Sequence, residues 1–341
     1  MNDGLDPANL TPVASLNRVR FTALSGLPIP AGMVDWAAYA LLSAKALSDL
    51  TARHSSADEA ARRFGERLGW LLVTLRLGDP ASRAARPDWD DSYWRHWGGI
   101  SRVYLGGGIV SGDIGPPIAE HASRTLSSAG MSDCVVNVAP WPEHLPLIGA
   151  ARTVSDAPAA VVLDFGQSFV KRGFARFQGD ALTSLRLLPR LPAGIPSIPP
   201  GTEPSVESVR RLGESMIATM AEIWRAAHAA DPAVSTTIAA SIASYLRDGQ
   251  PLARQGGAYA YLLGLSDNLA DRLGERLTAT LGREMMVRLL HDGTAAATAV
   301  SGEPHAAIIM LGTALGVGFP SASGPPCSLS PSFEVMERSA R

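Results

Sequence analysis

The 341-residue sequence contains few cysteines, and their positions exclude the usual cysteine-based sites. Cys134 and Cys327 are its only cysteines, and neither belongs to a CxxC or Cys/His pattern. Zinc sites and disulfide frameworks need several such residues at short, regular spacings. We therefore expect neither zinc nor a disulfide, and this cysteine usage fits a reducing cytoplasm.

The sequence also lacks a strong excess of charge of either sign and a long apolar segment. Its formal net charge is -2, so no global positive field exists to neutralise nucleic-acid phosphates, although a local basic patch stays open. No apolar run reaches the roughly 20 residues that a membrane-spanning helix needs. Residues 1–12 carry acids rather than the basic start of a secretion signal. We expect a soluble, cytoplasmic protein that binds neither nucleic acid nor membrane.

Two common nucleotide-binding signatures are missing as well. No segment fits the Walker A pattern, and no GxGxxG motif opens a helix, which argues against P-loop and dinucleotide-binding folds. Apolar material is plentiful, because 46% of the residues are hydrophobic. That amount suffices for one large core or two smaller ones, and we expect two domains.

Apolar strands that alternate with helices predict an α/β fold. The expected strands are residues 102–105, 134–139, 160–164, 169–177, 235–242, 285–290 and 306–311. The expected helices are residues 116–129, 148–151, 206–223 and 269–281, with one more from about 294. A capping box of Ser56 and Glu59 predicts another helix start. The proline-dense stretch 189–204 predicts a loop.

Glycine-containing turns follow apolar strands at three places and are candidate phosphate-binding loops. Glycine lets backbone N–H groups approach an anion and adopt positive φ, and a following hydroxyl or amide can donate to phosphate oxygens. A single turn of this kind is more commonly a plain strand exit, because glycine is the commonest turn residue. The three turns are residues 164–168, 106–108 and 312–313.

An acid, Asp292, stands between an apolar strand and a helix. A carboxylate at this position could accept the proton of a substrate hydroxyl as the hydroxyl attacks a γ-phosphoryl group. The helix N-terminus also favours negative charge nearby. Taken alone, an Asp-Gly-Thr sequence at a helix start is more commonly an N-cap.

Taken together, these segments resemble the ATP-dependent sugar kinases of the actin, heat-shock chaperone and hexokinase superfamily, especially the hexokinases and the ROK family of repressors and kinases. The first phosphate motif of that family, an Asp-x-Gly-x-Thr/Ser turn inside a hairpin, is similar to residues 164–168 (DFGQS), which Lys171 and Gly173 follow. Its catalytic segment, Asn-Asp-Gly-Thr-Ala-Ala, is similar to residues 291–297 (HDGTAAA).

Three further motifs carry the resemblance. The second phosphate motif, Leu-Gly-Thr-Gly, is similar to residues 311–314 (LGTA), in which Ala314 replaces a glycine. The adenosine motif, an apolar strand that runs into Gly-Gly-Gly-Ile/Val-Ser, resembles residues 103–111 (VYLGGGIVS). The small-residue segment Ile-Gly-Ala-Ala matches residues 148–151.

The order of these motifs differs from that of the family, because the adenosine motif and the Gly-Ala-Ala segment come first here. One rotation of the chain restores all five, so the resemblance implies a circularly permuted, two-lobed actin/hexokinase-like (ribonuclease H-like) α/β fold with an interlobe cleft. We expect residues 1–154 and 303–341 to form the lobe with the adenosine and second phosphate motifs. Residues 155–302 should form the lobe with the first phosphate motif, the catalytic acid and the acceptor site.

The resemblance implies phosphoryl transfer from Mg²⁺-ATP to a hydroxyl group. Asp292 would be the general base, and Asp164 would hold Mg²⁺, through water, because Mg²⁺ prefers oxygen ligands. The phosphates would be bound by Gly166, Gln167, Ser168, Lys171, Gly312 and Thr313, with Gly106, Gly107 and Gly108 by the adenosine. His291, Asp267 and Asn268 are candidate acceptor contacts, each with a loop or capping role as the alternative. An exposed hairpin lysine is the alternative for Lys171.

The sequence departs from the family where the acceptor would bind. His291 replaces the asparagine that usually precedes the catalytic acid, and the Cys-rich zinc motif and the Glu-x-Gly-His sugar motif are missing. The acceptor is therefore expected to be a sugar or a sugar-like compound such as an aminosugar or cyclitol. The sequence is also compatible with two alternative functions: a non-catalytic sugar- or nucleotide-binding regulatory protein, and an ATPase that acts as a conformational switch. It is compatible with a homodimer as well.

Overall fold

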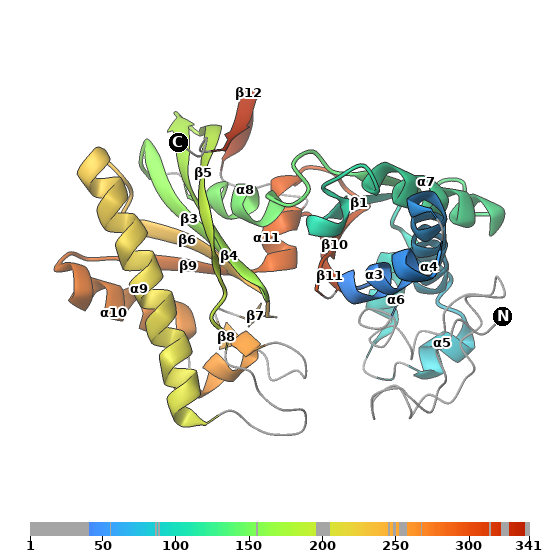
Figure 1. Cartoon of the computed structure of the whole chain (residues 1–341), viewed down its shortest axis with the longest axis horizontal. Helices are drawn as coiled ribbons and strands as arrows, with labels where there is room; N and C mark the ends of the chain where they lie inside the picture. Colours follow the sequence, from blue (N-terminus) through green and yellow to red (C-terminus); the bar gives the residue numbers. More distant parts are fainter. Residues whose placement is uncertain are drawn as a thin grey trace. The chain divides into compact units, whose positions relative to one another are not determined.

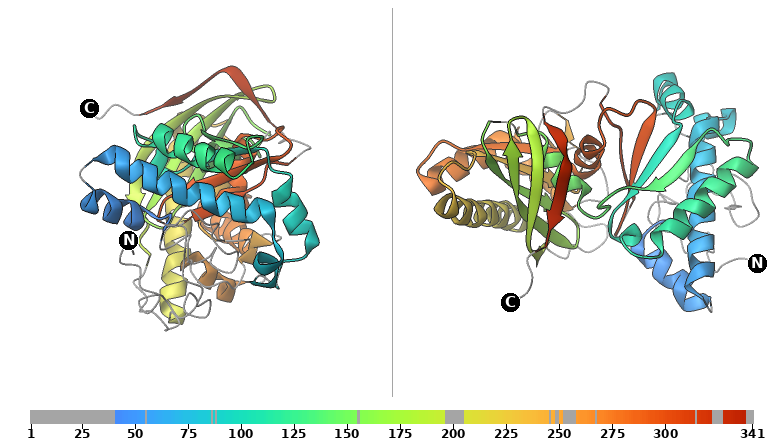
Figure 2. Two further views of the ribbon diagram at one scale, coloured as in Figure 1. Left: turned by 90° about the vertical axis from the view of Figure 1, so that its right-hand side faces the viewer. Right: turned by 90° about the horizontal axis from the view of Figure 1, so that it is seen from above.

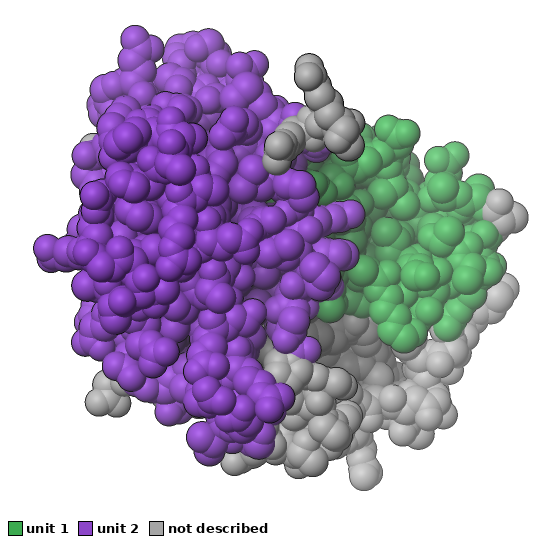
Figure 3. Space-filling view, turned by 60° about the vertical axis from the view of Figure 1, so that its left-hand side comes forward, with its two compact units in different colours: residues 1–143, 304–317 green, residues 144–303, 318–341 purple. Residues whose placement is uncertain are grey.

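The chain folds into two compact units, which Figure 3 colours separately. The first consists of the described residues up to 143 together with 304–317, and the second of 144–303 with 318–341. The computed structural model contains nine α-helices and two larger β-sheets within the residues that it describes. These residues are 41–54, 56–85, 87, 89–154, 156–195, 205–244, 246–247, 250–251, 258–266, 268–313, 315–321 and 327–337.

The first unit contains a four-stranded sheet in the order β11-β10-β1-β2 (Figure 1). Strand β1 runs parallel to both β10 and β2. Its elements are α3 (Ala44–Arg53), α4 (Ala57–Leu77), α5 (Pro80–Ala85), α6 (Asp91–Gly98), β1 (Arg102–Gly106), η4 (Gly108–Val110), α7 (Gly115–Ser128), β2 (Val135–Val138), β10 (Ala306–Leu311) and β11 (Leu315–Gly318), whose last residue is assigned to the second unit.

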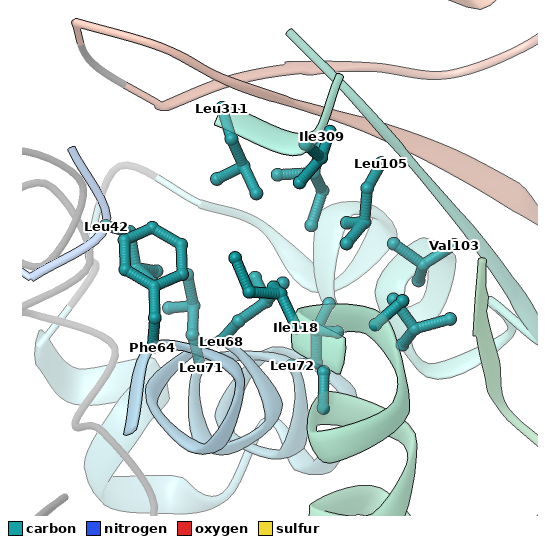
Figure 4. Packing of buried hydrophobic residues seen from close by; sticks show 14 of the residues in the cluster. Leu42, Phe64, Leu68, Leu71, Leu72, Val103, Leu105, Ile118, Ile309 and Leu311 are labelled. Carbon is teal, nitrogen blue, oxygen red and sulfur yellow. The ribbon is translucent and has the colours of Figure 1, made fainter. Parts of the chain in front are cut away.

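Helices α4 and α7 pack against each other and cover the sheet of the first unit, and together they form its core (Figure 4). Phe64, Leu68 and Leu72 recur at helical spacing along α4, as an amphipathic helix requires. They meet apolar side chains from β1, β10 and α7. Gly65 allows the close approach of α7, because a Cβ there would lie 2.8 Å from the Cβ of His121.

The second unit contains a six-stranded sheet in the order β12-β5-β4-β3-β6-β9 (Figure 1). Strands β3, β4 and β5 pair antiparallel, whereas β3, β6 and β9 run parallel and β12 runs parallel to β5. Its elements are α8 (Leu145–Ala151), β3 (Ala159–Phe165), β4 (Phe169–Gln178), β5 (Ala181–Pro192), α9 (Val206–Ala230), β6 (Thr237–Ile242), β7 (Leu246–Arg247), β8 (Gln250–Pro251), η5 (Ala258–Leu265), α10 (Leu269–Leu281), β9 (Met286–His291), α11 (Asp292–Ala299) and β12 (Ser328–Met336).

Helices cover both faces of the six-stranded sheet (Figures 1 and 2). Val161 and Leu163 on β3 pack with α9 and α10 in one apolar core. Ala160 and Val162 point to the opposite face, where α8 lies. All seven side chains of β3 are buried, which explains why its residues are apolar, apart from Asp164, on both faces rather than on alternate ones.

The strands and helices expected from the sequence are confirmed, with shifts of a few residues at their ends. The capping box is confirmed in part, because Ser56 Oγ accepts a hydrogen bond from the backbone N–H of Glu59 at the start of α4. The sequence does not predict strands β5, β7, β8, β11 and β12. No helix among the described residues is both long and apolar enough to cross a lipid bilayer.

The expected loop at residues 189–204 is wrong in part, because β5 continues to Pro192. The pairing of β4 with β5 shifts register between Val170 and Arg172, so Pro189 falls within a bulge. A bulge tolerates proline because no ladder hydrogen bond is required there. The Pro189 carbonyl instead accepts a hydrogen bond from Arg172 Nε at 3.1 Å. Residues 196–204 lie outside the described part of the chain.

The borders of the units differ from those expected for the two lobes. Residues 144–154 and 318–341 belong to the second unit, whereas they were expected in the lobe with the adenosine motif. Helix α8 packs against α11, and a Cβ on Gly149 would overlap the Ala295 carbonyl. Strand β12 extends the six-stranded sheet by pairing with β5. Both segments are therefore held by contacts inside the second unit.

Candidate functional site

Asp164 lies near the end of β3 and is 4% exposed. Ser241, its register partner on β6, donates a hydrogen bond from Oγ to Asp164 Oδ1 at 2.8 Å. Lys171, its register partner on β4, places Nζ 3.6 Å from Asp164 Oδ2. Sheet pairing therefore brings both partners to the carboxylate, and Lys171 is an ion-pair partner of Asp164 rather than a plain exposed lysine.

The charges around Asp164 act in opposite directions on its pKa. Burial raises the pKa of Asp164, the Lys171 ammonium lowers it, and the carboxylate of Asp292 raises it again. Two acidic groups that repel each other favour an additional cation beside them, above all where one of them is buried. The pair Asp164 and Asp292 therefore has the donor chemistry that Mg²⁺ prefers.

The glycine turn after β3 is fixed by hydrogen bonds at several of its residues. The Gly166 N–H donates to the Phe169 carbonyl at 3.1 Å, and the Tyr259 hydroxyl donates to the Gly166 carbonyl at 3.2 Å. Gln167 Nε2 reaches the Ala243 carbonyl after β6 at 3.5 Å. The Ser168 carbonyl accepts a hydrogen bond from the backbone N–H that follows β5. The turn is thus held in one conformation by β6, η5 and the end of β5.

Asp292 is the first residue of α11, and the N-cap is His291. Asp292 is therefore not at the N-cap position, and the His291 side chain, which is at that position, forms no capping hydrogen bond. His291 Nε2 lies 3.0 Å from Asp292 Oδ1, and the Gly293 N–H donates to the same oxygen at 2.7 Å. The Asp292 side chain is 26% exposed, so solvent or a substrate can reach it.

Asp164 and Asp292 lie at the same edge of the sheet. Strands β3, β6 and β9 are parallel, and the register pairs Asp164 with Ser241 and Ile242 with His291. The carboxyl ends of parallel strands meet at one edge, which is where open α/β sheets bind ligands. The electrostatic effect of Asp292 on the pKa of Asp164 agrees with this closeness. The second unit therefore brings together the first phosphate turn and the candidate base.

The first unit brings together the other two glycine-containing turns. Strand β1 pairs with β10 so that Gly106 lies opposite Met310, and both turns follow at the same edge. Gly107 has φ 93°, and a Cβ there would overlap the Leu311 carbonyl. Only glycine allows this conformation and this close approach. The predicted adenosine and second phosphate motifs are neighbours within this unit.

The remaining contacts in this part of the first unit anchor the two turns. The Gly107 N–H donates to the Pro142 carbonyl at 2.7 Å, and Ser111 Oγ donates to the Gly108 carbonyl at 2.9 Å. The Gly312 carbonyl accepts from the N–H at the start of α3 at 2.7 Å. Gly108 has open space where a Cβ would stand, so a ligand can approach its backbone.

The three residues expected to contact the acceptor differ in what the structure shows of them. Asn268 is the N-cap of α10, and its Oδ1 accepts a hydrogen bond from the Asp271 N–H at 3.2 Å. That contact is the capping role that the sequence left as the alternative. Asp267 lies outside the described residues. His291 contacts Asp292, as described above.

Sequence reasoning missed Ser241 and Tyr259, which hold Asp164 and the glycine turn. Ser241 lies in an apolar strand without a motif, and only the register of β3 with β6 connects it to Asp164. Burial raises the pKa of Tyr259, and the nearby Asp164 raises it further, so its hydroxyl stays protonated and can donate. Within the described residues, no group of three or more His, Cys, Asp or Glu side chains is arranged to hold a metal ion.

No protein-family model matches the chain, and no curated protein is significantly similar to it. The resemblance to sugar kinases therefore depends on the residues and the geometry described above.

Proposed function

We propose that the chain is an ATP-dependent phosphotransferase that phosphorylates a hydroxyl group of a sugar or a sugar-like compound such as an aminosugar or cyclitol. The observation that carries the proposal is the placement of Asp164 and Asp292 at the carboxyl edge of β3, β6 and β9, beside an anchored glycine turn. Mutually repelling carboxylates beside a phosphate-binding turn suit phosphoryl transfer, which depends on positioning and charge stabilisation.

In this mechanism Asp292 is the general base. Its carboxylate accepts the proton of the acceptor hydroxyl as that hydroxyl attacks the γ-phosphorus of ATP, and the bond to the β-phosphate oxygen breaks. Asp164 would hold Mg²⁺ through water, and the ion would neutralise charge on the phosphates when bound. Lys171, with Nζ 3.6 Å from Asp164 Oδ2, lowers the pKa of Asp164 and so opposes part of the upward shift that burial causes.

The glycine turns bind the nucleotide. In the second unit, Gly166, Gln167 and Ser168 form the turn that would lie against the β- and γ-phosphates, and the hydrogen bonds of Gly166 and Gln167 to the Phe169 and Ala243 carbonyls hold its shape. In the first unit, the resemblance gives Gly312 and Thr313 the role of the second phosphate motif and Gly106 to Gly108 that of the adenosine motif.

The sheet topology supports a ribonuclease H-like fold for the second unit. An antiparallel meander, β3-β4-β5, is followed by two strands, β6 and β9, that run parallel to the first strand of the meander. The hairpin β3-β4 carries the first phosphate turn, as in the sugar kinases. The candidate base follows β9 directly.

The chain order supports circular permutation. The sheet of the first unit combines β1 with β10, although about two hundred residues separate them in the sequence. The start of α3 also bonds to Gly312, near the other end of the chain. The rotated motif order and these pairings agree, because motifs from opposite ends of the sequence share one sheet.

The test is an ATP-consumption screen over sugars, aminosugars and cyclitols. Wild type should show acceptor-stimulated turnover, and Asp292→Asn should lower kcat by about 10²-fold or more, because the amide cannot take the proton. Asp271→Asn is the matched control, since Asp271 is an exposed acid in the first turn of another helix. A wild-type rate for Asp292→Asn would contradict the base assignment. ATP or sugar binding without turnover would instead support the non-catalytic regulatory alternative.

A further inference from the structure

His291 stands where the sugar kinases have asparagine, and only 9% of its side chain is exposed. It is the N-cap of α11, yet its side chain forms no capping hydrogen bond. Its ring lies between two other groups instead. Nε2 is 3.0 Å from Asp292 Oδ1, and Nδ1 is 3.4 Å from Thr294 Oγ1. The imidazole therefore connects the carboxylate to the first turn of the helix.

The chemistry of the partners determines which ring nitrogen carries the proton. A carboxylate oxygen accepts hydrogen bonds, so a hydrogen bond from His291 to Asp292 requires the ring proton on Nε2. In that tautomer Nδ1 has a lone pair, which can accept from the Thr294 hydroxyl 3.4 Å away. One orientation of the ring satisfies both contacts.

Both contacts of Asp292 lie on the same oxygen. Oδ1 accepts a hydrogen bond from the Gly293 N–H at 2.7 Å and lies 3.0 Å from His291 Nε2. Oδ2 has no hydrogen-bond partner within the part of the chain that the structure describes. Contacts on one oxygen alone restrict the rotation of the carboxylate and leave the other oxygen to take a proton.

We propose that His291 is a positioning residue, which holds Asp292 so that Oδ2 is the oxygen that accepts the proton of the acceptor hydroxyl. The inference rests on the proposed phosphotransferase function and replaces direct acceptor contact as the role of His291. Its burial agrees with this role, because the imidazole is less accessible than the carboxylate that it contacts. Thr294 in turn orients the ring.

The first test reads the hydrogen bond and needs no turnover. In ¹H–¹⁵N spectra of the full chain, the Nε2-bound proton of His291 should be visible and protected from solvent exchange. It should disappear in Asp292→Ala and persist in Thr298→Val, a control on the exposed side of the same helix. A proton that is absent in wild type, or equally protected without the carboxylate, overturns the inference.

The second test separates positioning from binding. His291→Ala should lower kcat by about 10- to 100-fold and leave the KM for ATP unchanged, because orientation rather than affinity is lost. His291→Asn should restore most of kcat, since its amide N–H can donate to Oδ1. Thr294→Val should have a smaller effect, and Thr298→Val none. If His291→Asn is as slow as His291→Ala, the inference is overturned.

The two proposals fail in different ways. If no acceptor stimulates ATP consumption by wild type, the phosphotransferase function fails, and the spectra alone decide whether His291 holds Asp292. If wild type turns over and His291→Ala has the wild-type kcat, the function stands and the positioning role fails.

Discussion

Ser241 Oγ donates a hydrogen bond to Asp164 Oδ1 at 2.8 Å, and both side chains are buried. The two residues lie on neighbouring parallel strands and are 77 positions apart in the sequence. The donor offsets part of the cost of placing a carboxylate in the interior of the sheet. It also fixes the direction in which the carboxylate points.

Removal of this donor should destabilise the second unit. Ser241→Ala leaves a buried carboxylate with one partner fewer, which costs about 1–3 kcal/mol of unfolding free energy at pH 8. Urea unfolding curves measure the loss. Ser215→Ala, on the exposed face of α9, is the control and should change stability by no more than about 0.5 kcal/mol. Equal midpoints for Ser241→Ala and wild type would contradict the prediction.

The raised pKa of Asp164 predicts a specific dependence of stability on pH. The folded state holds the proton of Asp164 more tightly than the unfolded chain, in which the pKa is near 3.8. Above that value the unfolded chain releases its proton first, so the contribution of Asp164 to stability falls as pH rises through the folded pKa. Asp164→Asn should remove this part of the decline.

Urea unfolding midpoints of wild type and Asp164→Asn, measured from pH 4.5 to pH 8, test whether the contribution of Asp164 to stability falls as pH rises. The difference in midpoint should favour Asp164→Asn increasingly as pH rises. Asp271→Asn, at an exposed position, should follow wild type throughout. A constant difference between wild type and Asp164→Asn would show that burial does not raise the pKa of this group.

Gly107→Ala should destabilise the first unit strongly. Positive φ alone costs a non-glycine residue about 1–3 kcal/mol, and the added Cβ would also overlap the Leu311 carbonyl. Gly112→Ala is the matched control, because no atom lies within 4 Å of the Cβ that it adds. Hydrogen exchange of the amides in β1 and β10 should increase in the first variant and stay unchanged in the second.

Tyr259→Phe should weaken ATP binding without unfolding the chain. The phenylalanine keeps the apolar contacts but loses the hydrogen bond that fixes the Gly166 carbonyl, which is worth about 0.5–1.5 kcal/mol, or a few-fold in affinity. Calorimetric titration with Mg²⁺-ATP measures the change. Tyr261→Phe, an exposed neighbour in η5, is the control. Equal affinities of the two variants for Mg²⁺-ATP would show that the Tyr259 hydroxyl does not contribute to ATP binding.

The sequence predicts the local features of this fold better than the long-range ones. The period of the hydrophobic pattern, the helix caps and the glycine turns depend on residues close together in the sequence. The sequence alone therefore locates α4, β3 and the turn at Gly166. The partners of Asp164 depend on strand register, which the sequence does not display. The position of Pro189 within β5 could not be predicted for the same reason. The bulge that tolerates this proline arises only from the pairing of β4 with β5.

The candidate site shows the same division. The sequence predicts the glycine turns and Asp292, because tight turns and helix starts require particular residue types at fixed spacings. His291 was identified as a departure from a family pattern, but its contact with Asp292 Oδ1 depends on how the side chain rotates at the end of β9. Rotamers at helix starts follow from packing rather than from sequence neighbours.

The pairing of β1 with β10 also determines how the chain can fold during synthesis. A ribosome releases β1 early, yet its neighbour β10 emerges only after nearly the whole six-stranded sheet has been made. Closing such a long loop is entropically costly and slow. The second unit, whose strands β3 to β9 are contiguous, can therefore fold first, while the nascent first unit waits with an unpaired apolar edge that is open to chaperones and to aggregation.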